Sequence, residues 1–166
     1  MKLCVLVWLS ILFIGQDDFV IKKKNVGSLK VGSYVTDVYD SFDKEKETSL
    51  IDRYLEASFS PAIQIKKAGE LLFVADINCS TIRSFEIYSP KYKTLSGVSV
   101  GSNFGKLKSK HSVTLENREG ALGAAVKELE MVFMFENTKR VQALDFNKVT
   151  LKDIPDEVKI ASIIVY

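Results

Sequence analysis

The triplet Val31-Gly32-Ser33 occurs again 69 residues later as Val100-Gly101-Ser102. Further segments after the first triplet resemble segments that follow the second triplet in the same order. The two copies are 69 residues apart at first and 78 residues apart near the end of the chain. The corresponding segments are 62–65 and 131–134, 74–78 and 143–147, and 82–88 and 160–166. Self-similarity at a nearly constant spacing is typical of an internal duplication. The sequence therefore predicts two related units in one chain.

A short helix is expected directly after each triplet. Ser33 and Ser102 suit the N-cap position, because a serine hydroxyl accepts a hydrogen bond from an unpaired backbone N–H of the first turn. Apolar residues then follow at positions i, i+3 and i+7, which lie on one helical face. They are Val35, Val38 and Phe42 in the first unit. In the second unit Phe104 and Leu107 are apolar and His111 occupies the third position of the stripe.

Strands are expected where β-branched and aromatic residues alternate with others. These segments are about 62–66, 71–77 and 82–88, followed by about 131–136, 140–146 and 159–166. A short helix can bury one face, and an antiparallel sheet is the simplest cover for it. The expected fold is α+β, with two tandem repeats, each a short helix followed by an antiparallel three- to four-stranded sheet. We assign 17–88 to the first repeat, 89–97 to a connector and 98–166 to the second, with a shared core.

The N-terminus has the pattern of a secretory signal peptide. Lys2 precedes an apolar run that extends from Leu3 to Gly15, and polar residues follow from Gln16. The run is shorter than the roughly 20 apolar residues that a transmembrane helix needs. We therefore predict that residues 1–16 are a signal peptide, that the protein is exported to the periplasm or outside the cell, and that no membrane span remains after cleavage.

Composition excludes several classes of protein. The 166 residues include 23 Lys and Arg against 21 Asp and Glu, so the net charge of +2 lacks the basic excess of a dedicated nucleic-acid binder. Two Cys and one His supply neither a Cys/His metal cluster nor a disulfide framework. The common phosphate-binding, dinucleotide-binding and hydrolase motifs are absent from the sequence. We accordingly predict a non-enzymatic protein with no catalytic residue, cofactor or metal and no nucleic-acid partner.

The segment from Tyr88 to Thr94, which leads into Gly97 to Ser102, resembles a motif of uncharacterised exported proteins of the Bacteroidota. The helix-then-sheet unit is similar in outline to the β-lactamase-inhibitor-protein-like fold, which the BamE-type lipoproteins share. These resemblances imply an exported bacterial protein. Cys4 lies inside the apolar run and not after it, so a lipid anchor is not implied. The inhibitors' disulfides are also absent, so neither β-lactamase inhibition nor any binding residue is carried over.

Tyrosines are the candidate partner-binding residues, since aromatic side chains dominate binding surfaces. Tyr34 and Tyr39 fall outside the apolar stripe of the first helix, and Tyr92 lies in the connector. The second unit has Asn103 and Lys108 where the first has the two helix tyrosines. The expected partner is an unknown envelope or extracellular protein, and the oligomeric state is left open.

An alternative function is a small hydrolase or carbohydrate-binding enzyme that uses Asp76 and Asp145 or the single histidine, His111. The two aspartates recur at corresponding places and could offer oxygen ligands, although aspartates at strand ends also bond turn amides. His111 corresponds to Phe42, which favours a packing role over a catalytic one.

Overall fold

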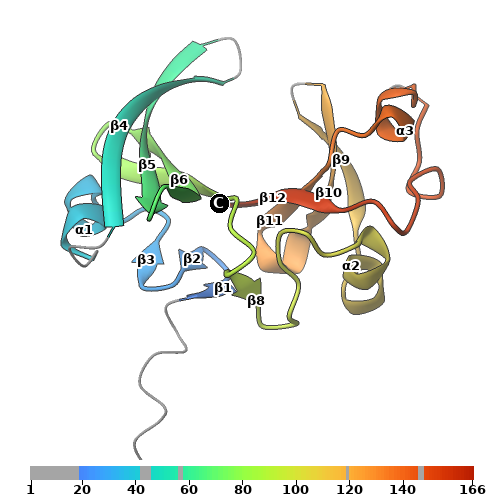
Figure 1. The fold of residues 1–166 in the computed structure, drawn as a ribbon, viewed down its shortest axis with the longest axis horizontal. Helices are drawn as coiled ribbons and strands as arrows, with labels where there is room; N and C mark the ends of the chain where they lie inside the picture. The colour runs from blue at the N-terminus through green and yellow to red at the C-terminus, as the bar shows by residue number, and fades with distance from the viewer. Residues whose placement is uncertain (1–18, 42–45, 56–57, 119, 146–147) are drawn as a thin grey trace, which may run out of the picture.

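The computed structural model describes residues 19–41, 46–55, 58–118, 120–145 and 148–166. These residues form an eight-stranded sheet in the order β4-β5-β6-β7-β12-β11-β10-β9 and a small sheet in the order β3-β2-β1-β8 (Figure 1). The strands are β1 (Val20–Lys22), β2 (Asn25–Val26), β3 (Leu29–Lys30), β4 (Lys46–Leu55), β5 (Ser58–Lys67), β6 (Glu70–Asn78), β7 (Thr81–Ile87), β8 (Lys93–Thr94), β9 (Thr114–Arg118), β10 (Ala121–Val126), β11 (Met131–Phe135) and β12 (Ile160–Val165). The helices are α1 (Val35–Asp40), α2 (Phe104–Lys110), α3 (Lys139–Gln142) and a 3-10 turn, η2 (Lys127–Leu129).

The large sheet consists of two runs of consecutive antiparallel strands, β4 to β7 and β9 to β12, which join at its centre. There β7 pairs antiparallel with β12, with Ile87 opposite Ile163 and Phe85 opposite Val165. All four of these side chains are fully buried. The junction therefore places the two halves of the chain on one continuous core.

The helices and the small sheet cover one face of the large sheet. Val38 of α1, Phe104 and Leu107 of α2 and Ile21 of β1 all belong to the buried apolar cluster that includes Phe85 and other residues of the sheet. On the opposite face, the β4–β5 and β9–β10 hairpins curl upward at the two sides (Figure 1). Among the described residues, no helix lies over the middle of that face, where polar side chains gather.

The two Val-Gly-Ser triplets dock on the last strand of their respective halves. Gly32 N–H donates to the carbonyl of Ile82 (2.8 Å), and Gly101 N–H donates to that of Ile160 (2.8 Å). In return, Ile82 and Ile160 donate to the carbonyls of Ser33 and Ser102, both at 2.9 Å. Gly32 and Gly101 have φ angles of +88° and +80°, which glycine adopts without the steric cost of a Cβ. Each triplet thus turns the chain into the helix that follows it.

The predicted fold class is wrong. The described residues are mostly β, and a single large sheet replaces two α+β tandem repeats with a sheet of their own. The helices have only six, seven and four residues, so they fill gaps beneath the sheet and do not make a layer. Strand pairing between β7 and β12 joins the two halves into this one sheet.

The predicted correspondence of 82–88 with 160–166 matches β7 and β12, the last strand of each half, but the correspondence of 62–65 with 131–134 was wrong. Residues 62–65 lie in β5, the second strand of the first half, whereas 131–134 lie in β11, the third strand of the second half. The segment 140–146 was predicted as a strand, but its described residues, 140–145, hold most of α3 and the turn after it. Ser33 and Ser102 are not the N-caps, because each lies one residue before it. The N-cap of α1 is Tyr34, and the N-cap of α2 is Asn103.

The predicted signal peptide and the predicted connector are the two remaining segments. The signal peptide, residues 1–16, lies outside the described residues, as does Phe42. The connector 89–97 is part of the fold, because its strand β8 pairs in parallel with β1. In the part of the chain that the structure describes, no helix is long and apolar enough to cross a membrane.

Candidate functional site: a polar trough on the uncovered sheet face

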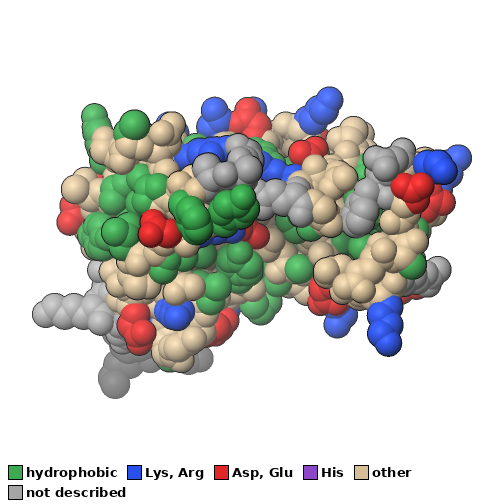
Figure 2. Space-filling model, turned by 90° about the horizontal axis from the view of Figure 1, so that it is seen from above, with side chains coloured by type: hydrophobic (Ala, Val, Ile, Leu, Met, Phe, Trp, Pro, Cys, Tyr) green, Lys and Arg blue, Asp and Glu red, His purple; other side chains and the backbone are tan. Residues whose placement is uncertain are grey.

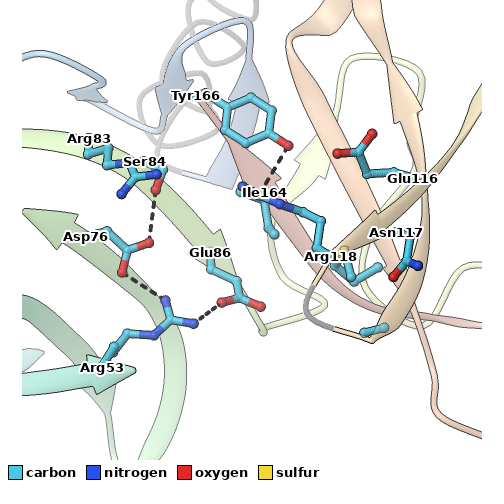
Figure 3. A pocket seen from close by; sticks show the side chains of 12 residues that line it. Arg53, Asp76, Arg83, Ser84, Glu86, Glu116, Asn117, Arg118, Ile164 and Tyr166 are labelled. Carbon is cyan, nitrogen blue, oxygen red and sulfur yellow. Dashed lines mark hydrogen bonds and ion pairs between the residues drawn. The ribbon is translucent and has the colours of Figure 1, made fainter. Parts of the chain in front are cut away.

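A trough of about 560 Å³ lies on the uncovered face of the large sheet. Its lining comes from every strand of that sheet except β5, and from the C-terminal Tyr166. Three arginines and three carboxylates are among the lining side chains (Figure 3). Seen from above, basic side chains lie in the middle of this face, beside apolar ones (Figure 2). The trough therefore combines both signs of charge with apolar surface.

Arg53 binds two carboxylates at once in one wall of the trough. Its Nη1 donates to Asp76 Oδ1 (3.0 Å), and its Nη2 donates to Glu86 Oε2 (2.5 Å). The second oxygen of each carboxylate accepts a hydrogen bond from a serine hydroxyl. Ser84 donates to Asp76 (2.9 Å), and Ser162 donates to Glu86 (2.7 Å). The side chains of Asp76 and Glu86 are only 8% and 14% exposed. All four carboxylate oxygens thus have a donor, as nearly buried charges require.

Strand register brings these groups together. Asp76 on β6 lies directly opposite Ser84 on β7, and Glu86 lies two residues beyond Ser84 on the same face. Arg53 is on β4, so its side chain must cross β5 to reach them. The β5 residue opposite Asp76 is the small Ala62, which leaves room for this crossing.

Burial and charge shift the pKa of the groups in this wall. Burial raises the pKa of the Asp76 carboxyl above its ordinary value, although the Arg53 guanidinium opposes this shift. Burial lowers the pKa of Arg53, but the charges of Asp76 and Glu86 outweigh it, and the net shift is upward. Burial, together with the negative charge of Glu86, also raises the pKa of Tyr88. The wall therefore holds Arg53 as a fixed cation.

The opposite wall is built around Arg118 of β9. Its Nη1 donates to the Tyr166 hydroxyl (3.4 Å), and the guanidinium carbon lies 5.3 Å from the centre of the Tyr166 ring. Glu116 lies two residues from Arg118 on the same face of the strand. Burial raises the pKa of Tyr166, so its hydroxyl keeps its proton and can donate a hydrogen bond into the trough.

The three tyrosines predicted to bind a partner have different environments. Tyr34 and Tyr39 are 64% and 48% exposed, as expected of residues outside the apolar stripe, but neither lines the trough. Tyr92 is 2% exposed, and its ring lies 5.7 Å from that of Phe73 in the core. The assignment of Tyr92 as a partner-binding residue is therefore wrong, because a buried ring cannot meet a partner at the surface.

The structure does not bring together the residues named for the alternative, a small hydrolase or carbohydrate-binding enzyme. Asp76 faces the trough, whereas Asp145 is exposed in the turn after α3, where it pairs with Lys148 (3.5 Å). His111 ends α2, on the helix-bearing side of the sheet, and does not line the trough. Both ring nitrogens of His111 are hydrogen bonded, so the residue is not simply the packing equivalent of Phe42. Among the residues the structure describes, no group of three His, Cys, Asp or Glu side chains is placed to hold a metal ion.

Sequence reasoning missed most of the residues that define the trough. Asp76 did carry a signal, since it is a charged residue between the apolar residues of β6. Arg53 and Arg118 carried none, because both lie in polar strands that resemble loops in sequence.

Comparisons with known proteins establish the fold and nothing more. Neither a family model nor a curated protein matches this chain. One similar solved structure is that of the uncharacterized protein YfeY from Escherichia coli, with a TM-score of 0.65 at 14% sequence identity. The match covers 89% of this chain and 98% of YfeY, so nearly all of that protein shares this arrangement of strands and helices.

Proposed function

We propose that this protein is an exported binding module that holds a segment of an envelope or extracellular protein in its trough. The observation that carries the proposal is the charge arrangement. Arg53, Arg83 and Arg118 balance Asp76, Glu86 and Glu116 in the lining, so the trough has no net charge. A balanced site suits the dipolar amides of a polypeptide better than a polyanion such as nucleic acid.

The state of the carboxylates supports binding over catalysis in the trough. A general acid and base must each have an atom available for the substrate. All four oxygens of Asp76 and Glu86 are occupied by the Arg53 guanidinium and by serine hydroxyls. Side chains held in this way form a rigid surface, which lowers the entropy cost of binding.

Export is part of the proposal and rests on the sequence of residues 1–16. Cell fractionation with the native N-terminus should place the protein outside the cytoplasm. Replacing Leu6 and Leu9 with Asp should keep the protein in the cytoplasm, because the apolar run would lose its hydrophobicity. Equal export of both forms would contradict the signal-peptide assignment.

Site-specific crosslinking in living cells tests the trough. A photoreactive residue replaces Ala121, which is exposed and lines the trough, and in a matched control it replaces the exposed Lys152, which does not. We expect a discrete crosslinked protein from position 121 and none from position 152. Arg118→Ala should weaken this product about tenfold, the effect of losing roughly 1.4 kcal/mol of binding energy.

Two results would overturn the proposal. One is the absence of any crosslinked protein at position 121 in correctly folded, exported protein. The other is the same product at both positions, which would show that the trough is not where the partner lies.

A further inference from the structure

Ser96, His111 and Glu128 form a continuous hydrogen-bonded chain on the helix-bearing side of the protein. Ser96 Oγ lies 2.7 Å from His111 Nε2, and His111 Nδ1 lies 3.2 Å from Glu128 Oε1. The residues come from three separate segments, namely the turn after β8, the end of α2 and the turn η2. A serine hydroxyl on one ring nitrogen and a carboxylate on the other is the arrangement that activates serine nucleophiles on many unrelated folds.

The direction of the hydrogen bonds in this chain follows from its two ends. The Glu128 carboxylate can only accept, so Nδ1 of the ring carries the hydrogen and Nε2 of neutral His111 accepts from Ser96. Ser96 Oγ is also 2.9 Å from the hydroxyl of Thr94, which accepts the backbone N–H of Val98 (3.0 Å). With the Ser96 hydrogen directed at His111, the Thr94 hydroxyl must donate to Ser96. The Ser96 proton therefore points at a base.

The site is accessible from solvent. Ser96 is partly exposed, and its neighbour Leu95 is 80% exposed. The His111 side chain is 12% exposed, so the base is shielded while the serine can be reached. Lys106 Nζ donates to the carbonyl of Gly97 (2.6 Å), the residue after Ser96, so a cation stands beside the site. A nearby positive charge stabilises the oxyanion that forms when a carbonyl is attacked.

We propose that Ser96 and His111 are the nucleophile and general base of a site that cleaves small carboxylic esters, with Glu128 as the positioning residue. This activity is independent of the trough. Ser96 Oγ attacks the ester carbonyl carbon while its proton moves to His111 Nε2, and the C–O bond to the alcohol then breaks as His111 returns that proton to the leaving oxygen. His111 then takes a proton from water as the water oxygen attacks the acyl carbon, and it returns that proton to Ser96 Oγ as the acyl–Oγ bond breaks. This releases the carboxylic acid and restores the serine.

A fluorophosphonate probe tests the nucleophile directly, because Ser96 Oγ would displace fluoride and retain the phosphonyl group. The full chain is treated with the probe, and peptide mass spectrometry locates the label. We expect labelling at Ser96 and a rate at least about 100-fold lower in His111→Gln, which removes the base. Ser109→Ala is the matched control, because Ser109 is an exposed serine of α2 whose hydroxyl donates to a backbone carbonyl. It should label at the unchanged rate.

Glu128 needs a measurement that separates positioning from stability. We expect Glu128→Gln to slow labelling about tenfold or more and Glu128→Asp to restore most of the rate, with the same thermal unfolding midpoint in both. Folded wild-type protein that carries no label at Ser96 would overturn the proposal. Equal labelling of wild type and His111→Gln would overturn it as well, since the serine would then react without its base.

Discussion

Arg53 and Asp76 are 23 residues apart in the chain and lie on strands that are not neighbours, yet their side chains meet at 3.0 Å across β5. Both charges are largely removed from water, with side-chain exposures of 19% and 8%. Such a pair depends on each partner, because a buried charge without its counter-ion is costly. The wall of the trough should thus contribute to the stability of the fold.

Removing Arg53 should destabilise the protein. We expect Arg53→Met to lower the free energy of unfolding by about 2–4 kcal/mol, because Asp76 and Glu86 would lose their cation. The triple variant with Asp76→Asn and Glu86→Gln should recover part of that loss, since it no longer buries unpaired charge. Urea unfolding measures both. A triple variant less stable than Arg53→Met would contradict this account.

The raised pKa of Asp76 predicts a pH dependence of stability. Between its ordinary value of 3.8 and the higher value in the folded protein, the native state binds more protons than the unfolded state. The free energy of unfolding contributed by Asp76 therefore falls as the pH rises through this window. We expect the stability difference between wild type and Asp76→Asn to move against wild type as the pH increases above 3.8, measured by urea unfolding at each pH. A shift in favour of wild type would contradict the assigned direction.

Truncation to alanine should destabilise the protein at Tyr92 and have almost no effect on its stability at Tyr34. Tyr92→Ala removes a buried ring from the core and should cost about 3–5 kcal/mol of unfolding free energy. Tyr34→Ala changes a side chain that is 64% exposed and should alter it by less than about 0.5 kcal/mol. Thermal or urea denaturation distinguishes the two, and comparable losses would show that the environments are misassigned.

Two glycines provide a matched test of packing. A Cβ on Gly123 of β10 would lie 2.8 Å from the backbone oxygen of Phe133, which cannot move without disturbing the neighbouring strand. We expect Gly123→Ala to cost about 1–3 kcal/mol in urea unfolding. A Cβ on Gly105 of α2 would instead lie 3.1 Å from the Cβ of Asp156, in an exposed turn, and a shift of a few tenths of an ångström relieves that contact. Gly105→Ala should therefore cost less than about 0.5 kcal/mol, because alanine also favours the helix.

Local pattern was sufficient for some elements and not for others. The apolar residues of 71–77 and 82–88 predicted strands β6 and β7, and the stripe from Phe104 to Leu107 predicted α2. β4 was missed because its sequence, KETSLIDRYL, is largely polar, as expected of a strand at the edge of a sheet. β10 was missed because its alanines and glycine have low strand propensity, although the sheet buries Gly123 and Ala124.

The candidate sites could likewise be recognised only in part from the sequence. His111 was recognised in the sequence as the one histidine, but its partners Ser96 and Glu128 lie 15 and 17 residues away on either side and share no motif with it. The Arg53 cluster joins four strands of the sheet, β4, β6, β7 and β12. No short spacing in the chain could have indicated that these side chains meet.

The sequence by itself determined the turns and the short-range elements. Gly32 and Gly101 permit a positive φ, and the apolar stripes after them start helices, because these preferences depend on a residue and its near neighbours. The tertiary structure alone decided that β7 pairs with β12, that the two halves share one sheet and that Arg53 reaches Asp76 across Ala62. Strand alternation specifies two faces but not the neighbouring strand, and long-range pairing is selected by the burial of the whole core.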